Sequence, residues 1–259
     1  MLDSLYAGAL ADAAARQELI SISQVEKLAL ASTPAIDAVQ TLSAGENIRV
    51  IAEIKRASPS KGRLAEISNP AELARAYEDA DASAISVLTE QRSFLGSLDD
   101  LDMVRKTVAL PVLRKDFIAN EYQVLEARAH GADFVLLIAA GLEPGVLGRL
   151  KTLIEALGMI AFIETHNKAE VDLAAEMGAK LVGINARNLS TFETDRGLFS
   201  ELASGLSMDC VKVAESAVRG VSDVEAYAAA GADCVLVGEA LVTGDARSLL
   251  RSFTQIPKA

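Results

Sequence analysis

Short apolar runs recur along the chain from residue 49 onward, with polar and turn-forming residues between them. Their starts lie roughly 22 to 35 residues apart, which is the length of one strand and one crossover helix. Each run is apolar almost throughout, as in parallel strands that are buried on both faces. The pattern predicts eight such strands, at residues 49–55, 84–89, 111–115, 134–139, 159–164, 181–185, 211–215 and 234–238.

Helix-start signals lie between several of these runs. Three places combine a capping residue with an acid three positions later, in front of an apolar-periodic segment: Ser97 with Asp100, Asn167 with Glu170, and Ser222 with Glu225. Before the first strand, helical periodicity predicts two further helices, at residues 3–18 and 23–32. Residues 1–47 are therefore expected to form a helical extension packed on the strands and helices that follow.

A short sequence repeat precedes alternate strands. GADFVLL begins at Gly131, GAKLVGI at Gly178 and GADCVLV at Gly231, with DASAISVL from Asp81 as a weaker copy. Glycine after a helix supplies the left-handed turn into the next strand. The repeat and the eight runs predict an α/β fold, a (β/α)8 TIM barrel over residues 48–259 within one domain of residues 1–259. An open doubly wound sheet is the alternative, although it seldom has eight evenly spaced strands.

Several of the apolar strands finish in a polar or charged residue. Burying such a residue is costly, and the carboxyl ends of barrel strands converge on one mouth, where these folds place their chemistry. Taken alone, each residue is equally well explained as a solvated strand end or half of an ion pair. Six such endings on five strands favour a shared catalytic site, built from Glu53, Lys55, Lys115, Glu164, Asn185 and Ser216, with Glu215 beside Ser216.

The composition narrows the classes of function. A formal net charge of -11 disfavours nucleic acid and anionic membranes as partners, and no apolar run approaches the length of a membrane span. Cys210 and Cys234 have no metal-site spacing, which favours a reducing, cytoplasmic location. His130 and His166 are expected at the surface or at helix ends rather than in a metal site.

A second signal lies near the last two predicted strands. Gly238 ends the eighth strand just before a short helical segment, and Ser216 lies in the preceding loop. Backbone N–H groups in these two loops form the phosphate site of many barrels. Ser58 and Lys61, in the segment after the first strand, are candidates for a mobile anion-binding loop, and an ordinary proline-containing turn explains that segment equally well.

Five motifs of the chain resemble those of the indole-3-glycerol-phosphate synthase family, in the family's order: IAEIKRASPSKG, SVLTEQRSFLGSLDDL, LRKDFI, GINARNLSTFETD and VGEAL. The resemblance covers roughly residues 46 to 245 and extends to the helices before the first strand. It implies a carboxy-lyase of tryptophan biosynthesis that cyclises 1-(2-carboxyphenylamino)-1-deoxyribulose 5-phosphate, with loss of carbon dioxide and water. It implies no cofactor and no metal.

The resemblance also implies roles for particular residues. Lys115 matches the general acid toward the ribulose carbonyl, and neighbouring positive charge is expected to lower its pKa. Glu164 matches the general base. Lys55 matches the residue that meets the substrate carboxylate, and Glu53 the one that orients the lysines.

The remaining matches are substrate ligands. Sugar hydroxyls are assigned to Asn185, Glu215 and Ser216, and the phosphate and carboxylate ends to Ser58, Arg187, Gly238 and Glu239. An apolar wall for the anthranilate ring is assigned to Phe94, Phe117, Leu136 and Leu189. The chain departs from the family pattern at Ala217, a substrate-binding position where glycine is usual, because alanine resists a positive φ.

Two other functions fit the same residues in part. A Schiff-base aldolase would use Lys115 or Lys55 to attack a substrate carbonyl. A phosphate-binding barrel without turnover is the second alternative, with Ala217 as its only indication. The related isomerase barrel fits the KRASPSKG and RKDF motifs poorly. A small phosphorylated substrate is the expected partner, and the chain is expected to be a monomer or a weak homodimer.

Overall fold

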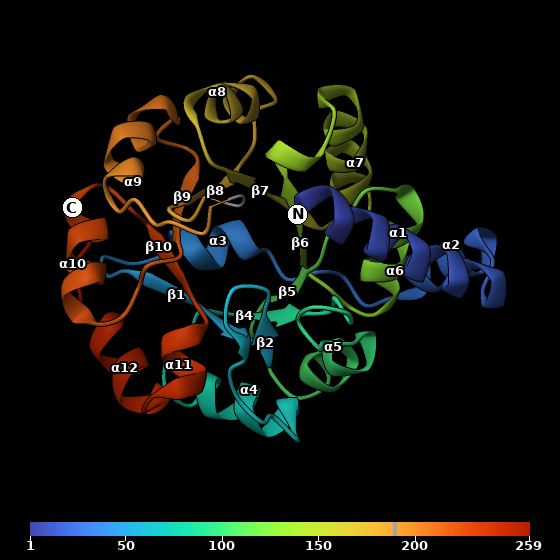
Figure 1. Cartoon of the computed structure of the whole chain (residues 1–259), viewed down its shortest axis with the longest axis horizontal. Coiled ribbons are helices and arrows are strands. Elements are labelled where there is room, and N and C mark those ends of the chain that lie inside the picture. Colours follow the sequence, from blue (N-terminus) through green and yellow to red (C-terminus); the bar gives the residue numbers. More distant parts are fainter. Residues whose placement is uncertain (189–190) are drawn as a thin grey trace.

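Eight parallel strands close into a barrel in this computed structural model, which describes residues 1–188 and 191–259 (Figure 1). Going round the barrel, the strand order is β1-β10-β9-β8-β7-β6-β5-β4. The strands are β1 (Arg49–Ile54), β4 (Ala84–Leu88), β5 (Val112–Lys115), β6 (Phe134–Ile138), β7 (Ile160–Thr165), β8 (Leu181–Asn185), β9 (Val211–Glu215) and β10 (Cys234–Val237). Each predicted strand is confirmed within one residue at either end, and the closed sheet rules out the open doubly wound alternative.

Helices surround the barrel and alternate with its strands. They are α4 (Pro70–Glu78), α5 (Leu98–Arg105), α6 (Glu121–Ala129), α7 (Pro144–Ala156), α8 (Lys168–Glu176), α9 (Gly197–Leu202), α10 (Val221–Ala229), α11 (Glu239–Thr243) and α12 (Ala246–Phe253), with 3-10 turns η1 (Ala139–Gly141) and η2 (Ala203–Gly205). A short hairpin of β2 (Ala57–Ser58) and β3 (Gly62–Arg63) follows β1.

Two of the three predicted helix caps are confirmed. Ser97 accepts the N–H of Asp100 at the start of α5, and Asn167 accepts the N–H of Glu170 at the start of α8. The prediction at Ser222 is wrong, because α10 already begins at Val221. There the side chain of Asp223 accepts the N–H of Arg219 at 2.8 Å and starts the helix earlier.

The repeat corresponds to a recurring turn before alternate strands. Gly131, Gly178 and Gly231 have φ values of +80°, +64° and +87°, and they precede β6, β8 and β10. In the weaker copy before β4, Asp81 takes the same left-handed conformation with a φ of +69°. Asp is among the few residues other than glycine that visit this region readily, which explains how the degenerate copy keeps the turn.

The strands are buried on both faces. One apolar cluster, which includes Ile51, Leu113 and Phe162, fills the barrel interior, and a larger one lies between the sheet and the outer helices. The ends of the barrel segment also meet, since Ile48 N–H donates to Ile256 O at 2.8 Å and Lys258 N–H to Glu46 O at 2.7 Å. The chain after the last helix thereby fastens the start of β1.

The first residues form helices outside the barrel, α1 (Leu2–Leu19), α2 (Ile22–Ala31) and α3 (Ala38–Ser43). The first two confirm the predicted extension, and α2 lies beside α6 (Figure 1). Helix α3 was not predicted. Its Ala38 and Leu42 are fully buried against the barrel interior, and α3 contacts β1, β4 and β9.

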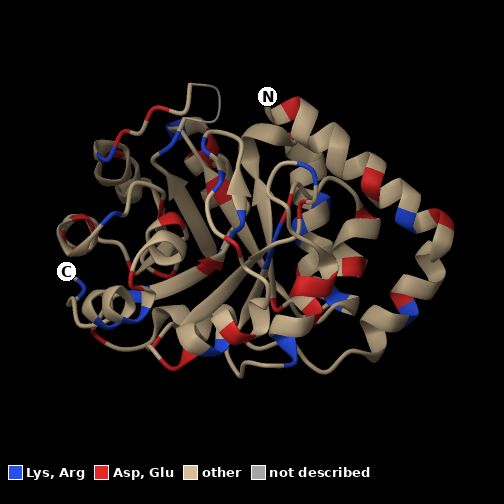
Figure 2. Cartoon of the chain, turned by 60° about the horizontal axis from the view of Figure 1, so that its bottom comes forward, with Lys and Arg blue, Asp and Glu red and all other residues tan. Residues whose placement is uncertain are grey.

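Positions of charged residues are spread over the outer helices and also occur in the loops at the barrel opening (Figure 2). Among the helices in the described part of the chain, none is both long enough and apolar enough to cross a membrane.

Candidate active site

The polar strand ends point to the barrel axis because side chains alternate along a strand. Ile51 faces the interior, so Glu53 and Lys55 follow on the same face, as predicted; Leu113 and Phe162 likewise place Lys115 and Glu164 there. Along β8 the same alternation places Asn185 on the inward face with Leu181 and Gly183, and along β9 it places Glu215 there with Val211 and Val213.

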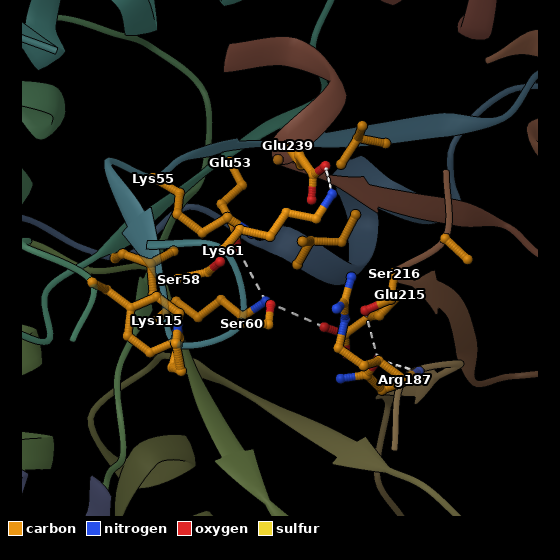
Figure 3. Close-up of a pocket in the computed structure, with 18 of the residues that line it drawn as sticks. Glu53, Lys55, Ser58, Ser60, Lys61, Lys115, Arg187, Glu215, Ser216 and Glu239 are labelled. Atoms are coloured by element: carbon orange, nitrogen blue, oxygen red, sulfur yellow. Dashed lines mark hydrogen bonds and ion pairs between the residues drawn. The ribbon is translucent and has the colours of Figure 1, made fainter. Parts of the chain in front are cut away.

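These side chains surround a cavity of about 600 Å³ at the carboxyl ends of the strands (Figure 3). That volume suits a substrate of ordinary metabolite size. Of the candidate residues, those that line the cavity are Glu53, Lys55, Ser58, Lys61, Phe94, Lys115, Phe117, Leu136, Glu164, Asn185, Arg187, Glu215, Ser216, Ala217, Gly238 and Glu239. Leu189, the remaining candidate, lies outside the described residues.

Lys115 lies at the centre of a group of carboxylates. Its Nζ is 3.0 Å from Glu53 Oε2 and 3.4 Å from Glu215 Oε2, while Lys55 Nζ is 2.8 Å from Glu53 Oε1. Burial alone would lower the pKa of Lys115, but the charges of Glu53, Glu215 and Glu164 raise it above its usual value. The expectation of a lowered pKa is therefore wrong, because acids rather than cations face this lysine.

Glu53 is held as a carboxylate by the two lysines. Burial alone would raise its pKa, but Lys115 and Lys55 lower it to about 2. With 2 % of its surface exposed, Glu53 forms ion pairs with both ammonium groups, and both lysines also line the cavity.

A hydrogen-bond chain runs from Glu164 across β8 to the loop after β9. Asn185 Nδ2 donates to Glu164 Oε1 at 3.1 Å, and Asn185 Oδ1 accepts from Ser216 Oγ at 2.7 Å. Asn185 Oδ1 also accepts the N–H of Arg187 at 3.0 Å. The amide of Asn185 is thus fixed in one orientation, with its donor on the proposed base.

Glu215 is the carboxyl whose environment favours the neutral form. Burial and the charge of Glu164 raise its pKa, and Lys115 only partly offsets them. Glu215 Oε1 has no hydrogen-bond partner among the described residues. It lies over Gly183, where a Cβ would overlap it and approach the ring of Phe162 to 2.9 Å. Glycine at this position of β8 makes the space in which Glu215 lies.

His166 is a site residue that the sequence reasoning missed. Its Nε2 is 3.1 Å from Glu164 Oε1 and its Nδ1 is 3.3 Å from Glu170 Oε2, with 11 % of the side chain exposed. His166 does lie at a helix end, directly before the N-cap of α8, but its ring is largely buried against Glu164 rather than at the surface. His130, which ends α6 beside Asp102, also lies at a helix end. The IETH sequence placed His166 two residues from Glu164, but nothing in it showed which way the ring turns.

The loops after β9 and β10 and the β2–β3 hairpin form another side of the cavity. Ser216 and Ala217 both have left-handed backbones, with φ values of +68° and +58°. Ala217 therefore adopts the conformation that its side chain was expected to resist. The ammonium group of Lys61 pairs with Glu239 at the start of α11, across from the hairpin (Figure 3).

Aromatic rings and α1 form the apolar side. Phe94 and Phe117 lie with ring centroids 6.1 Å apart, and Tyr6 of α1 packs edge-on against Phe117 at 5.5 Å. The cavity is also lined by Met1, Leu2 and Leu5. Their contribution was not predicted, since periodicity places an apolar face on a helix but not the surface that it covers.

Within the described residues there is no group of three or more His, Cys, Asp or Glu side chains arranged to hold a metal ion. The arrangement instead offers ammonium donors, a carboxylate acceptor and polar ligands around one space. Such a set suits proton transfer to and from an organic substrate.

Comparison with known proteins gives the same family along the chain. The model of the family described as indole-3-glycerol phosphate synthase matches residues 2–253. Proteins named indole-3-glycerol phosphate synthase include one from Mycobacterium sp. (strain KMS), 55% identical over 249 residues, 96% of this chain and 91% of that protein. Another, from Rhodococcus opacus (strain B4), is 55% identical over 248 residues, 95% of this chain and 92% of that protein.

Two solved structures of low sequence identity resemble the chain in fold. A 3-hexulose-6-phosphate synthase from Salmonella typhimurium has a TM-score of 0.62 at 15% identity, over 80% of this chain and 97% of that one. An N-acetylmannosamine-6-phosphate 2-epimerase from Clostridium perfringens has a TM-score of 0.61 at 15% identity, over 80% and 92%.

Proposed function

The chain belongs to the indole-3-glycerol phosphate synthase family, and from that membership we propose which of its residues carry the reaction. The enzyme is a carboxy-lyase of tryptophan biosynthesis. It cyclises 1-(2-carboxyphenylamino)-1-deoxyribulose 5-phosphate to indole-3-glycerol phosphate and releases carbon dioxide and water.

Lys115 is the general acid. The observation that carries this role is its ion pair with Glu53, whose charge contributes most to keeping the ammonium protonated. A protonated amine beside the cavity can donate to the ribulose carbonyl oxygen as the ring carbon that bears the carboxylate attacks the carbonyl carbon. Loss of carbon dioxide then restores the benzene ring.

Glu164 is the general base of the dehydration that follows. The hydroxyl formed at the former carbonyl leaves as water, and the neighbouring carbon loses a proton to the Glu164 carboxylate, which completes the indole. Burial alone would raise the pKa of Glu164, but His166, then Lys115 and Asn185, lower it. The carboxylate is thus ionised and ready to accept this proton at neutral pH.

The other lining residues bind and orient the substrate. Lys55 meets its carboxylate and shares in proton donation, and Glu53 holds both lysines. The substrate hydroxyls are bound by Asn185, Glu215 and Ser216. The phosphate and carboxylate ends are bound by Ser58, Arg187, Ala217, Gly238 and Glu239, the last through its backbone N–H. The anthranilate ring packs against Phe94, Phe117, Leu136 and Leu189.

Substitution of the acid and the base tests these roles. We expect Lys115→Ala and Glu164→Gln each to lower kcat by about 100-fold or more, the contribution typical of one general acid or base. The measurement is the rise in indole fluorescence on mixing enzyme with substrate, in the presence of a chelator because we propose that no metal is needed. Circular dichroism shows that each variant is folded.

Lys168→Ala and Glu155→Gln are matched controls, because both residues form exposed ion pairs on outer helices. They should leave the rate unchanged. A folded Lys115→Ala or Glu164→Gln enzyme with near-normal kcat would refute the corresponding role.

We further propose a cytoplasmic enzyme that acts as a single domain, as a monomer or a weak homodimer. The buried free thiols of Cys210 and Cys234 support a reducing compartment. The ion pair between Arg16 of α1 and Glu126 of α6 supports one folding unit.

A further inference from the structure

His166 lies behind Glu164, on the side away from the cavity. Glu164 lines the cavity, whereas His166 is not among the described residues that do. Glu164 Oε1 accepts a hydrogen bond from Asn185 Nδ2 at 3.1 Å and lies at ion-pair distance, also 3.1 Å, from His166 Nε2. Among the hydrogen bonds of the described residues none reaches Oε2, so Oε2 is the oxygen that remains for the substrate.

The other ring nitrogen of His166 faces a second carboxylate. Glu170 Oε2 is 3.3 Å from His166 Nδ1 and also accepts the His166 backbone N–H at 2.8 Å. Glu170 Oε1 accepts Asn167 Nδ2 at 2.6 Å, while Asn167 caps the Glu170 N–H. The start of α8 therefore holds Glu170 in place. Capping requires only Asn167 and Glu170, so the contact of the ring with Glu164 is additional to the cap.

A carboxylate oxygen lies within 3.3 Å of each ring nitrogen, and two carboxylates this close favour the doubly protonated imidazolium. Burial alone would lower the pKa of His166, but Glu164 and Glu170 raise it from 6.5 to about 10. Three further groups interact electrostatically with Glu164. Lys115 of β5 lowers the pKa of Glu164, and the charge of Glu164 raises the pKa of Glu215 of β9 and of Tyr6 of α1. Glu164 and Glu170 are the carboxylates in contact with the ring.

We propose that His166 is a positioning residue for the reaction: an imidazolium fixed between Glu170 and Glu164 that keeps Glu164 ionised and turns its Oε2 to the substrate. This inference rests on the proposed role of Glu164 as general base. Glu170 and His166 lie behind Glu164, and of these three side chains only Glu164 touches the substrate.

The pH dependence of kcat distinguishes positioning from a structural role. Replacing the imidazolium by neutral asparagine, His166→Asn, should raise the pKa of Glu164. The acidic limb of the kcat–pH profile should therefore move to higher pH by about 1 unit or more. KM should change by less than about twofold, because His166 does not line the cavity. Loss of stability alone would lower the amount of active enzyme without moving the limb. An acidic limb at the parental pH in folded His166→Asn overturns the proposal.

Glu170→Gln provides a second variant that keeps the cap, since glutamine is also suited to this capping position. It should move the limb in the same direction by a smaller amount. His130→Gln is the matched control, because it removes the other histidine of an acid pair, with Nδ1 2.8 Å from Asp102. A limb that moves as far in His130→Gln as in His166→Asn also overturns the proposal.

NMR titration of the His166 ring separates this inference from the assignment of the base. We expect a doubly protonated ring through pH 8 in the parent and a lower pKa in Glu170→Gln. A parental ring that titrates near 6.5 overturns the inference whatever the rate of Glu164→Gln. A high pKa of His166 together with an active Glu164→Gln enzyme would refute Glu164 as the base and, with it, the positioning role of His166.

Discussion

Ala217 shows how one residue can occupy a conformation that its side chain disfavours. A left-handed backbone costs a residue with a Cβ about 1–2 kcal/mol, and Ser216 beside it has the same conformation. Two consecutive left-handed residues persist only where the surrounding structure imposes them. Here Ser216 is held through its side chain, which donates to Asn185.

Replacing this alanine by glycine should therefore stabilise the enzyme without strengthening substrate binding. We expect Ala217→Gly to raise the free energy of unfolding by up to about 1 kcal/mol, the relief of strain less the greater chain entropy of glycine. KM should stay within twofold, because the loop already has the required shape. Urea unfolding and steady-state kinetics measure both quantities. A severalfold fall in KM would show that alanine does impair phosphate binding.

Which residues form the site could be predicted from the sequence, but the charge states of several could not. Strand alternation and the family motifs identified Lys115, Glu164 and Glu215 because these depend on position along one strand. The pKa of Lys115 depends on acids from three other strands, and sequence gives no distances between them. His166 was missed for the same reason, since its partner Glu170 approaches from the following helix.

At the scale of elements, α1 is tied to the strand that carries the proposed acid. Arg16 binds Glu126 through two bonds of 2.6 and 2.9 Å, and Glu126 also pairs with the fully buried Arg114 of β5 at 2.9 Å. Arg114 is the residue before Lys115. The ion network thus connects the helix that lines one side of the cavity to the strand on which Lys115 lies.

Cutting this connection should loosen α1 and weaken substrate binding. We expect Arg16→Met to lower the free energy of unfolding by about 1–3 kcal/mol, the contribution of hydrogen bonds to a charged group. KM should rise more than kcat falls, because Met1, Leu2 and Leu5 line the cavity. Hydrogen exchange should become faster in α1.

Arg92→Met is the comparison, because Arg92 binds Asp12 of the same helix from an exposed position. Exposed pairs contribute less, so its effect on stability and exchange should be smaller. Equal effects of the two variants would show that burial of the Arg16 pair is unimportant.

Elements with a long, regular pattern were the predictable ones. The barrel strands were recognised as continuous apolar runs at regular spacing along the chain, and the first two helices from their helical periodicity. Helix α3 has six residues, too few for a periodic signal, and its burial depends on the barrel end that it covers. The start of α10 was misplaced because Asp223 competes with Ser222 as the residue that organises the first turn.

For the whole molecule, the contacts of His166 with Glu164 and Glu170 make the free energy of unfolding depend on pH. The folded state binds the His166 proton with a pKa near 10, against 6.5 when unfolded. Its contribution to stability is therefore full below about pH 6.5 and is lost as the pH rises through about 10. The difference in free energy of unfolding between the parent and His166→Asn should thus be larger at pH 6 than at pH 9.5.

Urea unfolding of both proteins at the two pH values measures this difference. Glu215, whose pKa is also raised, remains in both proteins and largely cancels. His130→Gln should show no comparable change with pH. A parent-to-variant difference that is the same at pH 6 and pH 9.5 would contradict a strongly raised pKa.

The pairing of β1 with β10 determines when the barrel can close during synthesis of the chain. A ribosome delivers β1 early and β10 late, so the neighbour that completes one edge of β1 does not exist while most of the chain is being made. Until then the growing sheet has two unpaired edges, which are templates for pairing with other chains. Closure, stabilised by the contacts of Ile48 and Lys258, therefore comes only after β10 has been made. The incomplete barrel is therefore the state of this fold that is most open to aggregation.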